Sequence, residues 1–144
     1  MTARAAATLV IVSLCAGCSS SALNTTAPTT TPGTGTETFA SFLAIGGSSM
    51  HTFPVAQAGT IAITLTVVTP AGVVGLGVGV PNAGGCNLTN SLDASAAIAD
   101  ATTGATTPQL TIPAAVGTYC AKVYDSGQLG GIGRTFSVTI AHPS

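Results

Sequence analysis

A strict two-residue alternation is the feature of this sequence that most restricts its fold. In segment 60–68, TIAITLTVV, the bulky apolar residues Ile61, Ile63, Leu65 and Val67 alternate with threonine and alanine. Side chains of a β-strand point alternately to its two faces, so this pattern predicts a strand with one buried face and one hydroxylated face. Such a half-buried strand is typical of an antiparallel sheet.

Segment 74–80, VGLGVGV, repeats the alternation with glycine in place of threonine. Val74, Leu76, Val78 and Val80 share the predicted inner face, and three glycines share the other. Glycine weakens a strand, so this bare face requires a reason. We favour a bend, or another segment packed against the backbone; the alternative is a flat platform for a ligand.

Five further segments have the same period, and turn residues such as glycine and proline separate most of them. They are 38–45, 50–55, 109–113, 118–124 and 134–142. Together the segments predict an all-β fold, an antiparallel β-sandwich of jelly-roll or immunoglobulin-like type with about seven or eight strands. Pro54 lies inside its segment and therefore predicts an edge strand or a bulge. Between residues 82 and 107 the pattern lapses, and we expect there one more strand or a short helical turn, together with a mobile loop.

The predicted inner faces also carry most of the aromatic side chains. Besides the two apolar rows, the expected core comprises Phe39, Phe53, Val55, Tyr119, Val123, Phe136, Val138 and Ile140. Burial of each is worth about 1.5–3 kcal/mol before entropy is counted, so a core of this size can hold one domain without a metal.

Charged side chains are rare, at 5% of the residues against about 25% in ordinary proteins. The positive ones are Arg4, Lys122 and Arg134, and they form no cluster in the sequence. Nucleic acid binding requires clustered Lys and Arg to neutralise phosphates, so no nucleic acid partner is expected. Electrostatic binding to anionic lipid headgroups would require a similar basic cluster.

Residues 1–17 predict a secretory signal peptide. Arg4 precedes the apolar stretch AAATLVIVSL, which is too short to span a membrane as a mature helix and is followed by small residues. The alternative, an N-terminal core helix, lacks the polar stripe of an amphipathic helix. The sequence CAGC at 15–18 resembles the lipobox of bacterial lipoproteins, in which small residues precede an invariant cysteine. The resemblance implies that Cys18 receives a diacylglyceryl group and becomes the first residue after cleavage, although Cys15 stands where that family usually has leucine.

Residues 18–36 predict a disordered tether. They are rich in threonine and proline and have few apolar side chains, so they cannot offset the entropy lost on ordering. A spacer between a lipid and a folded domain at 37–144 would have this composition. Ser19 follows the candidate cysteine, and the resemblance to lipoproteins implies outer-membrane sorting if the cell is Gram-negative. The alternative is ordinary cleavage after Ala22, which would release a secreted protein.

Four cysteines divide into two groups on this interpretation. If Cys15 leaves with the signal and Cys18 is acylated, Cys86 and Cys120 remain, and such a pair in an exported domain predicts a disulfide. It would close a loop of about 35 residues, worth roughly 3–4 kcal/mol in the chain-entropy description. The alternative, a metal-binding or catalytic thiol, lacks neighbouring His or Cys at ligand spacing.

Two stretches of the expected domain resemble the bacterial pre-peptidase C-terminal domain family. The first contains HTFPVAQAGTIAITLTVVTP and VGLGVGVP, and the second contains PAAVGTYCAKVYDSGQLGG and RTFSVTIAHP. Members of that family carry a Gly-x-Tyr segment before a strand, here Gly117 to Tyr119, and end on an alternating strand, here with Phe136, Val138 and Ile140. The resemblance covers most of 38–142 and implies a β-sandwich that is generally non-catalytic and accompanies secreted peptidases or surface proteins. This sequence carries no peptidase, so we expect a stand-alone lipoprotein.

Few side chains are candidates for a catalytic or metal-binding role. The histidines His51 and His142 are interpreted as solvated strand residues and not as general bases. Asp93, Asp100 and Asp125 lie in or near predicted loops and are weak candidates for calcium, which prefers carboxylate and carbonyl oxygens. Their spacing is not that of a dedicated calcium loop, and we expect no other cofactor.

Three classes of function remain. We expect a non-enzymatic envelope lipoprotein, anchored to the membrane by its lipid, whose sandwich binds an envelope protein or a glycan through its loops or its threonine-rich sheet face. The alternatives are a purely structural envelope lipoprotein and, less favoured, a secreted enzyme-associated domain or unrecognised hydrolase. The expected location is extracytoplasmic, on a bacterial membrane, or secreted if ordinary cleavage applies.

Overall fold

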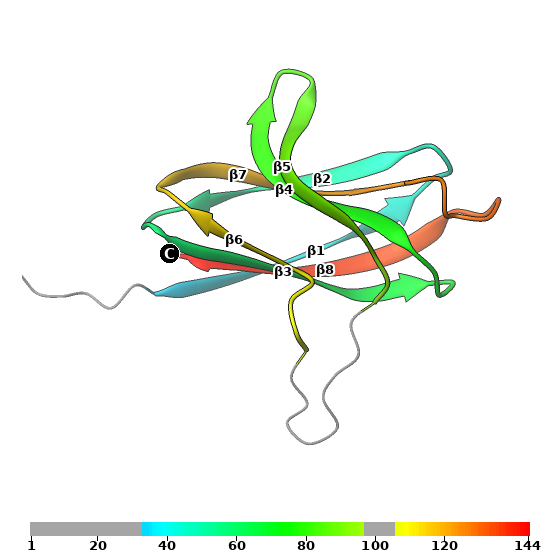
Figure 1. Ribbon diagram of the computed structural model, residues 1–144, viewed down its shortest axis with the longest axis horizontal. Coiled ribbons are helices and arrows are strands. Elements are labelled where there is room, and N and C mark those ends of the chain that lie inside the picture. The colour runs from blue at the N-terminus through cyan, green and yellow to red at the C-terminus, as the bar shows by residue number, and fades with distance from the viewer. Residues whose placement is uncertain (1–32, 97–105) are drawn as a thin grey trace, which may run out of the picture. The chain divides into compact units, whose positions relative to one another are not determined.

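The computed structural model describes residues 33–96 and 106–144, which form eight strands. The strands are β1 (Thr34–Leu43), β2 (Ser48–Val55), β3 (Gly59–Thr69), β4 (Val74–Asn82), β5 (Gly85–Ala94), β6 (Leu110–Ala114), β7 (Gly117–Tyr124) and β8 (Arg134–Pro143). All pairings are antiparallel and make two facing sheets (Figure 1). Sheet A has the order β1-β8-β3-β6 and sheet B the order β2-β7-β4-β5. The predicted all-β antiparallel sandwich is confirmed, and Pro54 lies in an edge strand, as predicted.

The core lies between the two sheets and is built from alternate residues of the strands. Ile63 and Leu65 of β3 and Leu76 and Val78 of β4 are completely buried. The aromatic and aliphatic residues predicted to join them are buried too, except Tyr119, which is partly buried and packs against the core. Each fully buried aliphatic side chain contributes about 1.5–3 kcal/mol relative to an exposed one, so this layer holds the two sheets together.

The apolar row predicted for β3 is interrupted by a β-bulge. The register of β3 on β8 shifts between Leu65 and Val67, which leaves one extra residue in β3. An extra residue exchanges the two faces of the strand beyond it. Val68 therefore turns inward and is 7% exposed, whereas Val67, predicted to be inside, is 46% exposed.

The region where the alternation lapses contains β5, so the expectation of one more strand there is confirmed. The expected mobile loop falls largely on residues 97–105, outside the described residues. Pairing of β4 with β7 ends at Gly79, and the rest of the β4–β5 hairpin rises above sheet B (Figure 1). Val80 lies on this projecting part, which explains why it is 48% exposed although its alternation predicts an inward position.

The bare face of β4 is covered by its neighbours, as the favoured interpretation predicts. A Cβ atom on Gly75 would collide with the ring of Tyr124 on β7. A Cβ atom on Gly79 would collide with the carbonyl group of Asn87, because the hairpin bends so sharply that the backbone of β5 lies against β4. Only glycine leaves room for these contacts.

A disulfide joins Cys86 of β5 to Cys120 of β7, with the two Cα atoms 5.9 Å apart. These are the strands that flank β4 in sheet B, and Cys86 faces Pro81 close to the turn of the hairpin, so the bond ties the turn end of the hairpin to the interior strand β7. The predicted pairing is confirmed. Disulfides persist in oxidising compartments, and this one is consistent with an extracytoplasmic location.

The start and the end of the folded domain lie side by side. Thr34 pairs with Pro143, and the backbone amide of Ser144 donates to the carbonyl of Gly33 at 2.9 Å. The first strand thus begins before the predicted boundary at residue 37, within the expected tether. Cys18 lies outside the described residues. In residues 33–96 and 106–144 there is no helix long and apolar enough to cross a membrane.

Candidate functional site

Asp125 holds two loops together by hydrogen bonds. Its two carboxylate oxygens accept hydrogen bonds from the amides of Gly46, at 2.8 Å, and Gly127, at 2.7 Å. The bond from Gly46 is the main cause that lowers the pKa of Asp125. These bonds fasten the β1–β2 turn to the loop after β7. Asp93 is exposed on β5, Asp100 lies outside the described residues, and the described ranges contain no group of three or more His, Cys, Asp or Glu side chains arranged to hold a metal ion.

Arg134 also forms its hydrogen bonds inside the fold. Its side chain is 8% exposed, and its guanidinium donates to the carbonyls of Pro70, Ala71 and Leu129. Hydrogen bonds from a charged donor are stronger than those between neutral groups. Arg134 therefore connects the β3–β4 turn to the β7–β8 loop and is not available to a ligand at the surface.

Three ionisable side chains that are distant in sequence meet at the open edge of the sandwich. Glu37 comes from β1, His51 from β2 and His142 from β8. The Nε2 atom of His51 lies 2.6 Å from one carboxylate oxygen of Glu37, and the Nε2 atom of His142 lies 3.2 Å from the other. Because β1 and β2 belong to different sheets, Glu37 links sheet A to sheet B. We call these three residues the His–Glu–His clasp.

The surroundings of the clasp are aromatic. The ring of His51 stacks on Phe39 with centroids 5.5 Å apart, and the ring of His142 lies 5.3 Å from Phe53. His142 is 5% exposed, so its interpretation as a solvated residue is wrong, and His51 is half-buried. The hydrogen bond from His51 is the main cause that lowers the pKa of Glu37, with burial acting in the opposite direction.

A carboxylate beside a histidine is also found in catalytic triads, where the histidine contacts a nucleophilic hydroxyl or thiol. In the part of the chain that the structure describes, the hydrogen bonds of both rings go only to Glu37 and to the carbonyl of Pro143. The geometry is that of a bridge between two sheets. One feature of the sequence indicates that Glu37 points into the sandwich: the alternation of β1 places it on the same inward face as Phe39 and Leu43.

The outer face of sheet A is hydroxylated and uncharged. The charged residues in its strands, Glu37 and Arg134, both turn inward. Threonine dominates the outward positions, as predicted for β3. The exposed threonines on this surface, which we call the hydroxyl face, are Thr34, Thr36, Thr38, Thr60, Thr69, Thr111 and Thr135.

The outer face of sheet B differs in kind. Lys122 lies 6.0 Å from the centroid of the Tyr124 ring, and that ring covers Gly75. Asp93 and the disulfide belong to the same sheet. Sheet B thus carries charged side chains and the disulfide. The outer face of sheet A carries mostly small polar side chains, together with the exposed Phe42 and Val67.

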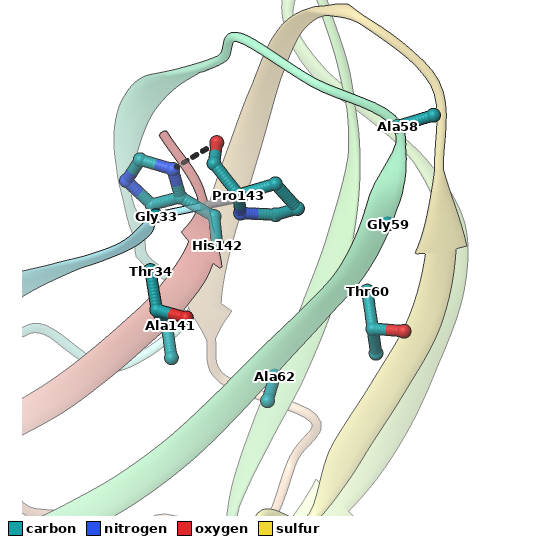
Figure 2. A pocket seen from close by; sticks show the side chains of 9 residues that line it. All are labelled: Gly33, Thr34, Ala58, Gly59, Thr60, Ala62, Ala141, His142 and Pro143. Atoms are coloured by element: carbon teal, nitrogen blue, oxygen red, sulfur yellow. Dashed lines mark hydrogen bonds between the residues drawn. The ribbon is translucent and has the colours of Figure 1, made fainter. Parts of the chain in front are cut away.

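A pocket of about 350 Å³ lies at one end of the hydroxyl face (Figure 2). Thr34 of β1, Thr60 and Ala62 of β3, and Ala141 and Pro143 of β8 are among its lining residues. Ala62 and Ala141 are register partners on neighbouring strands, so two methyl groups lie together where larger side chains would fill the space. The pocket therefore has an apolar floor and threonine hydroxyls at its sides.

Neither a scan against models of known protein families nor a search of curated proteins finds a match for this chain.

Proposed function

We propose that the protein is a non-enzymatic envelope lipoprotein whose β-sandwich binds an envelope component through the hydroxyl face. One observation carries the proposal: the outer face of sheet A is uncharged, rich in exposed threonine and hollowed by a pocket. The charged groups of its strands are used inside the fold, in the His–Glu–His clasp and in the bonds of Arg134. What remains outside is a surface suited to a neutral polar partner.

The strands make this surface suitable for binding. A threonine hydroxyl can donate one hydrogen bond and accept others, and its β-branch restricts the side chain to few rotamers. Residues on paired strands are held in place by the backbone ladder, so little conformational entropy is lost when a partner binds. The threonines on β1 and β8 are therefore preorganised for binding.

The lipid anchor is the second part of the proposal. It is supported by the lipobox resemblance at Cys18 and by the disulfide, which is consistent with an exported domain. The Thr/Pro-rich segment before Gly33 would lead from the lipid to the start of β1. Attached in this way, the domain can meet wall or surface material while it remains with the membrane.

The anchor is tested with Cys18→Ser, which removes the thiol that would carry the lipid. We expect the wild-type protein to sediment with membranes and to incorporate labelled palmitate. The variant should appear in the soluble extracytoplasmic fraction without label, because the described domain presents no basic cluster to hold it on a membrane. Sedimentation of both forms with membranes, without label, would contradict a lipid anchor.

Binding is tested with isolated envelope fragments and two lysine substitutions on opposite outer faces. Thr38→Lys places a charge on the hydroxyl face, and Thr118→Lys places the same charge on the exposed outer face of sheet B. We expect Thr38→Lys to lower the affinity about tenfold, which corresponds to roughly 1.4 kcal/mol, and Thr118→Lys to leave it unchanged. Equal binding of all three proteins would contradict the assignment of this face and favour a purely structural role.

A further inference from the structure

The hydroxyl face contains a trough that crosses the strands. The register aligns Thr36 of β1, Ala141 of β8, Ala62 of β3 and Thr111 of β6 in one row. The two central positions of this row are alanine, so its middle is low, and both ends carry a hydroxyl. Neighbouring strands are about 4.8 Å apart, so the row extends about 14 Å from β1 to β6.

Taller side chains stand on both sides of this row. On one side, Thr38 and Thr139 are register partners on β1 and β8. On the other side are Thr34, Pro143 and Thr60, which line the pocket of about 350 Å³ together with the two alanines (Figure 2). The two alanines thus form an apolar floor that has Thr34 and Thr60 on the pocket side and Thr38 and Thr139 on the other.

The trough offers no charge to a ligand. His142 is the one ionisable residue among those that line the pocket, and its Nε2 atom is directed to Glu37 at 3.2 Å, inside the sandwich. An anionic or cationic ligand would lose its hydration here without gaining a counter-ion, which is unfavourable. A neutral ligand with many hydroxyl groups would exchange hydrogen bonds with the threonines at little cost.

The trough also lacks the side chains that dominate protein–protein interfaces. Such interfaces derive most of their binding energy from Trp, Tyr and Arg anchors seated in pockets. None of these residue types lines the pocket. A sugar ring has an apolar C–H face and a rim of hydroxyl groups. The alanine methyl groups match the C–H face, and the threonine hydroxyls beside them match the rim. Thr36 and Thr111, at the two ends of the row, would bond the neighbouring rings of a chain.

We propose that this trough binds a neutral polysaccharide, laid across the strands of sheet A over Ala141 and Ala62. The inference rests on the proposed function, because it names the partner class of the same face. The threonine hydroxyls would bond the rims of the sugar rings, while the alanine methyls and Pro143 contact their apolar faces.

The test is affinity electrophoresis of the detergent-solubilised protein in gels that contain one polymer each: laminarin, dextran, xylan or amylose. Alginate and heparin serve as charged polymers. We expect at least one neutral polymer to retard the protein, and we expect the retardation to persist in about 0.5 M NaCl, since no ion pair is involved. Alginate and heparin should have no effect.

The decisive variants fill the trough. Ala62→Leu and Ala141→Leu each place a larger apolar side chain on its floor, and we expect each to weaken binding about tenfold or more. Ala40→Leu makes the same change at an exposed outward position of β1, beside Ser137 and outside the pocket, and should bind as the wild type does. Unchanged thermal unfolding of the three variants establishes that the fold is intact.

Two results would overturn the inference: no neutral polymer retards the protein, or Ala62→Leu and Ala141→Leu bind as tightly as Ala40→Leu. The proposed function fails separately. If envelope fragments still bind and Thr38→Lys abolishes this binding while all four neutral polymers are inert, the face is functional and its partner is a protein or a charged glycan. If neither fragments nor polymers bind, both proposals are wrong.

Discussion

Glu37 accepts hydrogen bonds from His51 and His142, which places a carboxylate between the two sheets at the edge where β1 and β2 approach. An inward charge on an edge strand also discourages pairing with another chain, because the charge would have to be buried. Among the described residues, Glu37 and Arg134 are charged groups that connect elements far apart in sequence. These two charges stabilise connections between elements.

The clasp predicts a loss of stability in acid. The pKa of Glu37 is lowered in the folded protein, so the unfolded chain binds its proton more readily. The contribution of Glu37 to the free energy of unfolding is therefore present above the ordinary pKa of 4.5 and lost as the pH falls below it. Glu37→Gln should cost about 1–2 kcal/mol at pH 7 and little in acid. Urea unfolding of both proteins at several pH values measures the difference.

Asp125 also has a lowered pKa, so the wild type alone cannot isolate the clasp. The informative quantity is the difference between wild type and Glu37→Gln, in which the contribution of Asp125 cancels. A difference that stays constant as the pH falls would show that Glu37 does not act through its charge.

Gly79 gives a second prediction at this scale. A Cβ atom there would meet the backbone of Asn87, which cannot move without opening the hairpin. Gly79→Ala should lower the free energy of unfolding by at least about 2 kcal/mol and reduce the yield of the disulfide. Gly84→Ala is the matched control in the same hairpin, since its nearest neighbour would be the side chain of Asn82 at 3.5 Å. A stable Gly79→Ala protein with a complete disulfide would contradict the close approach.

Residue-level prediction from the sequence succeeds where the reason is local or compositional. The inward side chains follow from alternation, and the pairing of Cys86 with Cys120 follows once the other cysteines are assigned to the signal and the lipid. The clasp could not be predicted, because Glu37 and His142 are 105 residues apart and meet only through the register of β1 on β8. The threonine face of β3 was predictable, but the alignment of Ala62 with Ala141 depends on the same kind of non-local register.

At the scale of elements, alternation identifies strands that carry an apolar row and fails for a strand that lacks one. β5 is an edge strand with mostly exposed or partly exposed residues, so it has no apolar row to recognise. The bulge in β3 has no local signature either, because it arises from pairing with β8. The strand order within each sheet is likewise decided by long-range packing, which a single sequence does not display.

We expect removal of the disulfide to destabilise some strands more than others. Replacing both Cys86 and Cys120 with serine removes a bond that spans 34 residues, and the chain-entropy description gives a loss of roughly 3–4 kcal/mol. The projecting part of the β4–β5 hairpin should open first, because it has lost its tie to β7. Hydrogen exchange should accelerate in β5 far more than in β3 and β8. A uniform acceleration through all strands would contradict this local role.

At the scale of the whole molecule, the low charge predicts insensitivity to salt. With only 5% charged residues, surface ion pairs and charge repulsion contribute little to folding. The melting temperature should change by less than about 2 °C between roughly 0.05 and 0.5 M NaCl. Ammonium sulfate should still raise it, since sulfate is excluded from protein surfaces and strengthens apolar burial. A marked dependence on NaCl at neutral pH would mean that the clasp and the bonds of Arg134 are more exposed to ions than their geometry indicates.

The neighbouring positions of Gly33 and Ser144 have a practical consequence. Both flank the hollow that Thr34 and Pro143 help to form, so a purification handle or fluorescent protein fused after Ser144 would sit over its mouth. Such a fusion would block the proposed sugar site while the domain stays folded. The turn at Gly46 and Gly47 is no substitute site for an internal epitope, because it is bonded to Asp125. Any C-terminal handle should instead be removed by protease before ligands are screened.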